Sequence, residues 1–304
     1  MKNLIAVSSY SLRQCLGPIR VAGRGPDGRP TEFFWDQPQS MTLLEFPGAV
    51  RERLNLSAIE ICQFHITNLE PDFIAALKKA LHAADVQLIN MPIDIGDIST
   101  PNPSWREEDL RAIEKWMEVA AELECPMVRV NAGHPMASDS STAPEVTIES
   151  YRRLGRTARS LGIQLLVENH GGITTDPESL VSLLEGAGQE ALKLLLDIGN
   201  FEPLLSTQHA LKPGQAWPKV DVTPVYQAIT RLAPLAHMVH AKAHEFDPAG
   251  QPVRMDVARA LRIIRDANYS GPISVEYEGE QGDPWENTRR TLVIVEQVFQ
   301  TESR

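Results

Sequence analysis

The stretch IQLLVENHGGITTDPESLVSLLEGAGQEALKLLLDI, residues 163–198, decides the fold. It begins and ends with short apolar runs, 163–169 and 192–198, which have the length of buried β-strands. Between them, Asp176-Pro177 places an N-capping residue directly before a proline, which predicts that a helix begins there. The stretch therefore predicts a strand, a helix and a second strand.

The same unit repeats along the chain. Further apolar runs lie at residues 4–9, 58–64, 86–91, 127–132, 237–242 and 273–278. Amphipathic segments separate them, with apolar residues at the spacing of a helix that buries one face, as in 73–81, 110–120 and 292–298. Eight such units predict a (β/α)₈ TIM barrel, which needs about 250 residues plus insertions. An open doubly wound sheet is the alternative, but no run is followed by a GxGxxG turn.

Composition excludes several classes of protein. The formal net charge of −11 disfavours general binding of DNA or RNA, and no apolar run is long enough to cross a membrane. Residues 1–15 show no secretion signal, and Cys15, Cys62 and Cys125 are too widely spaced for a disulfide framework. We therefore expect a cytoplasmic protein without nucleic-acid or membrane partners.

Two long insertions interrupt the pattern, at residues 11–42 and 202–221. Both are rich in proline, glycine and polar residues, and both follow a strand and precede a helix. Such loops lie over the C-terminal face of a barrel, where active sites are built. We interpret them as candidate lids.

The last four strands each carry an inward ionisable group near the C-terminal end. Alternate strand residues point to the same side, so Glu168 follows Leu166 inward and Asp197 follows Leu195. The same parity selects His240 and Glu276. Three carboxylates and an imidazole in one barrel mouth favour a bound divalent cation, and this donor set suits Mn²⁺, Mg²⁺, Co²⁺ or Zn²⁺. A shift of two residues in the last strand would bring in Glu278 or Glu280 instead.

Four motifs carry a family resemblance: ENHGG (168–172), LDIGN (196–200), VHAKAH (239–244) and ISVEYEG (273–279). In this order they resemble the sugar isomerase/epimerase group of the xylose-isomerase-like TIM barrels, which also contains endonuclease IV, inosose dehydratases and hydroxypyruvate isomerases. The resemblance covers the chain from residue 59 onward and is compatible with a homo-oligomer. We expect one barrel domain over residues 1–304. The resemblance also implies that Glu168, Asp197, His240 and Glu276 bind one metal ion. Asn200 and Ala243 depart from the histidine and aspartate that are common in the group.

Other polar residues are candidates for binding substrate. Arg129 and Asn131 share an inward parity on the fourth strand, and an ion pair with Glu60 is an equal alternative for Arg129. The full set of substrate-binding candidates is Arg129, Asn131, His134, His170, Asn200, Lys242 and His244. Lys242 could instead neutralise the carboxylates around it, and His170 could support a ligand.

The resemblance implies an isomerase or epimerase that acts on a sugar or polyol. A proton would leave a carbon next to a carbonyl through a metal-stabilised enediolate, with Glu168 and Glu276 as the acid/base pair. A metal-dependent dehydratase acting on a keto-polyol such as an inosose, and a sugar-binding protein without turnover, are the alternatives. Endonuclease activity is disfavoured because the further histidine and aspartate ligands of that enzyme cannot be placed.

Overall fold

The computed structural model describes residues 3–25, 29–133, 144–212 and 215–299. Within these ranges eight parallel strands close into a barrel in the order β1-β10-β9-β8-β7-β6-β5-β4, and the outer strands β1 and β4 pair. The barrel strands are β1 (Ile5–Ser8), β4 (Ala58–Glu60), β5 (Gln87–Ile93), β6 (Met127–Val130), β7 (Gln164–Glu168), β8 (Lys193–Asp197), β9 (Ala236–Ala243) and β10 (Ile273–Tyr277). The TIM barrel predicted from the sequence is confirmed, and each predicted run contains one strand or overlaps it.

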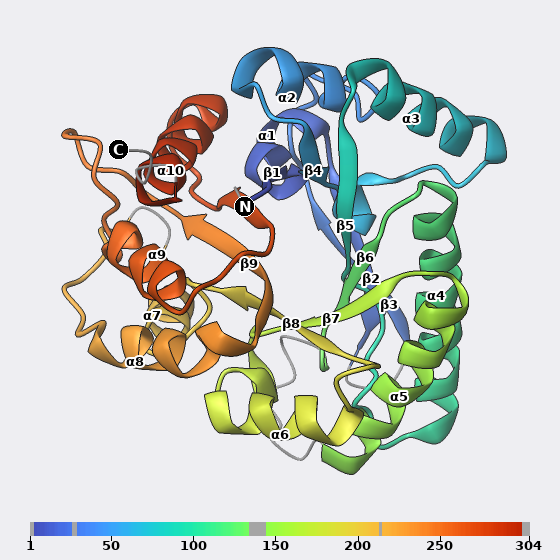
Figure 1. Ribbon diagram of the computed structural model, residues 1–304. Coiled ribbons are helices and arrows are strands. Elements are labelled where there is room, and N and C mark those ends of the chain that lie inside the picture. Colours follow the sequence, from blue (N-terminus) through green and yellow to red (C-terminus); the bar gives the residue numbers. More distant parts are fainter. Residues whose placement is uncertain (1–2, 26–28, 134–143, 213–214, 300–304) are drawn as a thin grey trace.

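Helices alternate with the strands and surround the barrel (Figure 1). The surrounding helices are α2 (Phe46–Leu54), α3 (Pro71–Ala84), α4 (Pro103–Glu122), α5 (Pro144–Ser160), α6 (Pro177–Ala187), α8 (Thr223–Leu232), α9 (Val257–Asp266) and α10 (Pro284–Phe299). Asp176 caps α6 by accepting a hydrogen bond from the Ser179 amide at 2.8 Å, and Asp283 accepts one from the Trp285 amide at 2.9 Å. The start of α6 thus uses the capping residue predicted from the sequence, and α10 begins in a similar way. No helix among the described residues is both long and apolar enough to cross a membrane.

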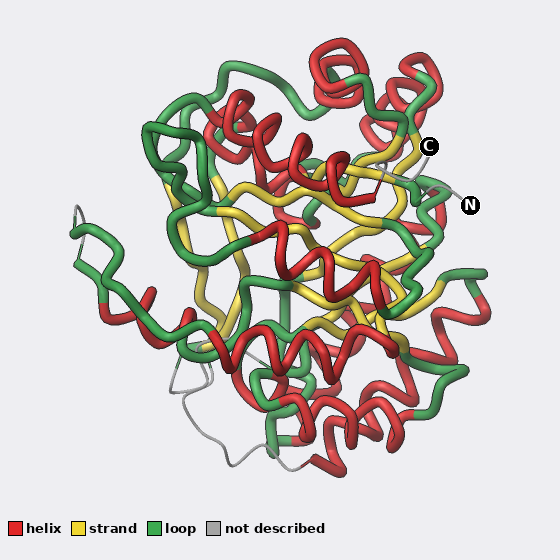
Figure 2. Tube along the Cα trace, turned by 60° about the vertical axis from the view of Figure 1, so that its left-hand side comes forward, coloured by secondary structure: helices red, strands yellow, loops and turns green. Residues whose placement is uncertain are grey.

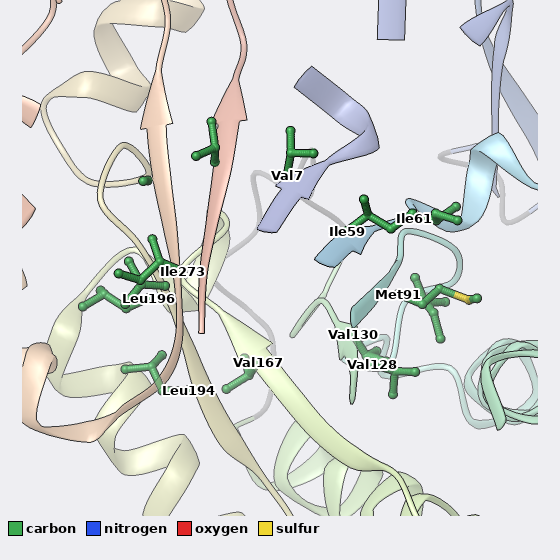
Figure 3. Packing of buried hydrophobic residues seen from close by; sticks show 14 of the residues in the cluster. Val7, Ile59, Ile61, Met91, Val128, Val130, Val167, Leu194, Leu196 and Ile273 are labelled. Atoms are coloured by element: carbon green, nitrogen blue, oxygen red, sulfur yellow. The ribbon is translucent and has the colours of Figure 1, made fainter. Parts of the chain in front are cut away.

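Two apolar clusters divide the strand residues by parity. One set, which includes Val167, Leu194 and Leu196, packs outward against the helices in the main core (Figure 3). The alternate residues form a separate cluster in the barrel interior, made of Ala6, Ala58, Ile89, Met127, Leu166, Leu195 and Met238. Polar residues that continue this inward parity therefore lie above an apolar floor, at the C-terminal mouth.

The insertion after β1 contains structure that the sequence analysis did not predict. After the short helices η1 (Ser9–Leu12) and α1 (Arg13–Leu16), strands β2 (Ile19–Arg24) and β3 (Pro30–Trp35) pair antiparallel. Ile19 and Val21 pack on Cys62 and Phe64, which follow β4 at the mouth. The hairpin therefore lies over the C-terminal face as expected for this insertion, but as a paired ribbon and not as an irregular loop.

Short helices occupy several other connections. The second insertion contains α7 (Leu204–Ala210), and the remaining connections contain η2 (Gln63–His65), η3 (Gly172–Thr174) and η4 (Ala233–Leu235). Figure 2 shows the strands enclosed by the helices, with the connecting segments at the two ends of the barrel. These connections leave the eight-unit pattern intact.

A close approach of backbone to α5 yields a prediction about stability. A Cβ atom at Gly155 would lie 2.7 Å from Ala191 Cβ and 2.8 Å from the Ala191 carbonyl oxygen. We expect Gly155→Ala to lower the free energy of unfolding by about 1–3 kcal/mol, because the connection before β8 must shift. Gly48 of α2 has no atom within 4 Å of such a Cβ. Gly48→Ala should therefore stabilise by about 0.5–1 kcal/mol, and urea unfolding that ranks the two variants the other way would contradict the packing.

Candidate metal centre

The C-terminal ends of β7, β8 and β9 bring three ligand-type side chains together. Glu168, Asp197 and His240 are buried, and each offers one ligand atom within 4.8 Å of the others. In the described part of the chain this is the one group of histidine, cysteine and acidic residues with such spacing. Their positions follow from register, since Asp197 is the partner of His240 in the β8–β9 ladder.

The ring of His240 is oriented by a fourth buried carboxylate. Its Nε2 lies 3.0 Å from Glu60 Oε1 and 3.1 Å from Glu60 Oε2, and Asn90 Nδ2 donates to Glu60 Oε2 at 2.6 Å. An Nε2 that donates to Glu60 leaves Nδ1 as the ring atom for a metal. The sequence analysis did not assign Glu60 to the site, although it ends β4 with the same inward parity as Ala58.

His240 Nδ1 has no hydrogen-bond partner among the described residues. It faces Glu168 Oε1 at 3.5 Å, Asp197 Oδ2 at 3.7 Å and Glu276 Oε2 at 3.5 Å. A buried nitrogen that faces carboxylate oxygens beyond hydrogen-bond distance fits a site shaped for a cation. Glu276, on β10, lies outside the group of three but contributes the third of these oxygens.

Two asparagines hold Asp197 in place, one through its backbone and one through its carboxylate. Asn169 donates to the Asp197 carbonyl at 2.8 Å and accepts from the Asp197 amide at 2.9 Å, while the Gly199 amide donates to Oδ1 at 2.7 Å. Asn200 Nδ2 donates to Asp197 Oδ2 at 3.1 Å and to Glu168 Oε1 at 3.2 Å. Asn200, the departure from the group pattern, is therefore placed directly against two of the candidate ligands.

Arg129 is engaged by carboxylates within the barrel. Its guanidinium forms an ion pair with Asp94, which directly follows β5, and its Nε lies 2.8 Å from Glu168 Oε2. Asn131 accepts from Arg129 at 3.1 Å and donates to Asp94 at 2.9 Å. An ion pair with Glu60 was expected as one alternative for Arg129, but the structure shows Asp94 and Glu168 as its partners.

Lys242 supplies a second buried cation. Its Nζ lies 2.8 Å from Asp197 Oδ2, 3.2 Å from Glu276 Oε2 and 3.3 Å from Glu278 Oε1. Glu278 also contacts His244, whose Nε2 lies 3.0 Å from Glu278 Oε2. Glu280, the other alternative to Glu276, is exposed. Of the three glutamates, Glu276 is therefore the one beside His240, as the parity of the strand predicts. Glu278 contacts Lys242 and His244 instead.

The remaining substrate-binding candidates are spread around this centre. His170 follows β7, is partly buried, and has an Nδ1 without a hydrogen-bond partner in the described ranges. His244 follows β9 and is buried. His134 lies outside the described residues.

The pKa shifts show that burial and nearby charges act in opposite directions on the groups of this site. Burial acts to raise the pKa of Glu276, but attraction by Lys242 and His240 outweighs it and lowers that pKa to about 2. Burial acts to lower the pKa of His240, but Glu60 and Glu276 raise it well above its ordinary value. Burial raises the pKa of Asp197 despite the attraction of Lys242. Each buried carboxylate depends on a nearby positive charge, and a divalent ion would supply more of it.

Comparison with known proteins places this geometry in a family. The sequence profile of the xylose isomerase-like TIM barrel family matches residues 50–295. The chain belongs to this family. No curated protein sequence matches it.

Solved structures with the same fold share little sequence with this family member. A D-psicose 3-epimerase crystallised in the presence of D-fructose is 16% identical with a TM-score of 0.67, over 98% of this chain and 99% of the other. An L-ribulose 3-epimerase is 14% identical with a TM-score of 0.69, over 98% and 95%. A xylose isomerase-like TIM barrel protein from Mycobacterium smegmatis in complex with magnesium is 18% identical with a TM-score of 0.62, over 98% of each chain. At these identities the likeness establishes the fold.

The ion pairs of Arg129 lead to a prediction about stability. Arg129→Met would leave Asp94 and Glu168 without their guanidinium in the barrel interior, where loss of one partner costs about 3–5 kcal/mol. Urea unfolding of metal-depleted protein measures the loss.

Arg20→Met serves as the control. Arg20 pairs with Glu32 at 2.6 Å, but their side chains are 56% and 48% exposed. This variant should change stability by less than about 1 kcal/mol. Equal losses in the two variants would contradict a special role for the buried pair.

Proposed function

We propose that this protein is a divalent-metal-dependent sugar isomerase or epimerase. The observation that carries the proposal is that His240 Nδ1, which has no hydrogen-bond partner in the described part of the chain, is buried among oxygens of Glu168, Asp197 and Glu276. The names of two similar structures, a D-psicose 3-epimerase and an L-ribulose 3-epimerase, support a sugar as the substrate class. The magnesium complex of a third supports a divalent ion.

Four side chains would hold the ion: Glu168, Asp197, His240 and Glu276. Three anionic oxygen donors and one imidazole suit Mn²⁺, Mg²⁺, Co²⁺ or Zn²⁺ and leave coordination positions open for substrate. Glu60 would keep Nδ1 of His240 directed at the ion by accepting from Nε2. When bound, the ion would polarise the carbonyl of a sugar and acidify the neighbouring C–H group.

Glu276 is the better placed of the two candidate bases. Its side chain is 9% exposed, against 1% for Glu168, so a substrate entering through the mouth meets Glu276 more readily. Glu168 is held on both oxygens, by Arg129 at Oε2 and by Asn200 at Oε1. In the proposed reaction Glu276 takes the proton from carbon, and Glu168 serves as the acid/base group on the other side of the carbon chain. Delivery of a proton by Glu168 to the opposite face of the same carbon gives epimerisation, and delivery of a proton to the neighbouring carbon gives isomerisation.

Metal binding is tested first with purified, metal-depleted protein. Addition of Mn²⁺ or Mg²⁺ should raise the melting temperature, since an ion that binds only the folded state stabilises it. Glu60→Gln keeps the shape of the side chain but removes the charge facing His240, and should weaken Mn²⁺ binding about 10–100-fold in titration calorimetry. Glu280→Gln, on the exposed glutamate beyond β10, should bind Mn²⁺ like the wild type. Unchanged affinity in Glu60→Gln would contradict the orienting role.

Catalysis is tested by deuterium incorporation. The metal-loaded protein is incubated in D₂O with a panel of ketoses and an inosose, and recovered sugars are analysed by mass spectrometry. We expect deuterium at the carbon next to the carbonyl, with rates about 10²–10⁴-fold lower in Glu276→Gln. Glu280→Gln is again the control and should keep the wild-type rate.

Three outcomes of this experiment are distinct. Deuterium without a change in covalent composition supports an isomerase or epimerase. A product lacking one molecule of water would instead identify a dehydratase. Sugar binding without deuterium or product across the panel would identify a binding protein and would overturn the proposed activity.

A further inference from the structure

The ammonium group of Lys242 and a divalent ion would require the same oxygens. Lys242 Nζ lies 2.8 Å from Asp197 Oδ2 and 3.2 Å from Glu276 Oε2. These are two of the three oxygens that face His240 Nδ1, at 3.7 and 3.5 Å. The lysine therefore already contacts two of the three proposed ligand oxygens.

The alternative oxygen of Asp197 is not free to replace Oδ2. Oδ1 accepts a hydrogen bond from the Gly199 amide at 2.7 Å, and this bond belongs to the tight connection after β8. Oδ2, which faces His240 Nδ1 at 3.7 Å, is thus the oxygen that Asp197 presents to the proposed ion. Any ion that binds there shares it with Lys242 or displaces the ammonium group.

Lys242 also has two acceptors that are not among the candidate ligands. Glu278 Oε1 lies 3.3 Å from Nζ, and Nζ donates to Asn200 Oδ1 at 3.1 Å. The side chain is 2% exposed, so water does not offer an equal alternative. A small movement toward Glu278 and Asn200 would keep the ammonium group paired while it leaves Asp197 and Glu276.

The backbone at Gly199 leaves room for the side chain of Lys242. A Cβ atom at Gly199 would lie 2.8 Å from Lys242 Cδ and 3.1 Å from its Cγ. The absence of a side chain at Gly199 therefore lets the methylene chain of Lys242 run along the connection after β8. The position of the ammonium group is set by this packing as well as by charge.

We propose that Lys242 is a tethered cation that competes with the metal: it holds the acidic cluster together without the ion, and moves toward Glu278 when the ion binds. The inference rests on the proposed metal site and assigns to Lys242 the control of its affinity. Without a positive charge, the carboxylates of Asp197, Glu276 and Glu278, which all contact Lys242, would repel one another. The lysine thus stabilises the metal-free protein and weakens ion binding by the same contacts.

The test is a double-mutant cycle on Mn²⁺ affinity, measured by the electron paramagnetic resonance signal of free Mn²⁺. Lys242→Met should bind Mn²⁺ about tenfold or more tightly than the wild type, and its metal-free form should melt at a lower temperature. A purely structural role would instead weaken binding. If Lys242→Met does not fold, Lys242→Gln is used in its place, with the same expected increase in Mn²⁺ affinity and the same expected lower melting temperature.

Glu278→Gln separates direct competition from general electrostatics. It removes the negative charge toward which Lys242 moves, so it should weaken Mn²⁺ binding in protein that retains Lys242. In the Lys242→Met background its effect should fall to less than half, because no ammonium group remains to be accommodated. Additive effects of the two changes, or an Mn²⁺ affinity of Lys242→Met no higher than that of the wild type, would overturn the competition. A wild-type protein that binds no Mn²⁺ would overturn the proposed metal site itself.

Discussion

The balance of charge inside the barrel mouth is the constraint on which the site depends. Glu60, Asp94, Glu168, Asp197, Glu276 and Glu278 converge there, and Arg129 and Lys242 are the cations that contact them. Buried anions of this density are costly unless each has a positive partner. Arg129 pairs with carboxylates at the ends of β5 and β7. Lys242 pairs with carboxylates at the ends of β8 and β10. His240 lies between them, and its Nδ1 faces the region that neither cation occupies.

Much of this could be predicted from the sequence, for physical reasons that also explain what was missed. The barrel strands are short apolar runs because both their faces are buried, and this makes them easy to recognise. The β2–β3 hairpin was missed because its strands are largely exposed, with Phe33, Phe34 and Trp35 among the exposed apolar residues, and so they lack that signature. The same parity rule that selected Glu168, Asp197 and His240 also applies to β4, where it would have selected Glu60.

Partners across the barrel depend on register, which the sequence alone does not fix. The β4–β5 ladder shifts between Ile59 and Glu60, and β5 continues to Ile93, so Asp94 comes beside Arg129 on the neighbouring strand. Glu60, which lies two strands away from Arg129, turns to His240 instead. Single-residue shifts of this kind decide which of two carboxylates, Glu60 or Asp94, forms an ion pair with Arg129. They are a property of the closed barrel and not of either strand alone.

The apolar interior of the barrel limits the direction from which protons reach the carboxylates at the mouth. Seven interior side chains, from Ala6 to Met238, fill the space beneath the acidic cluster. A packed interior of this kind gives water no second entrance from the far end. Protons therefore reach Glu168 and Glu276 from one direction, through the mouth. In the proposed reaction a sugar would enter by the same opening, so substrate binding and proton exchange with solvent would share one route.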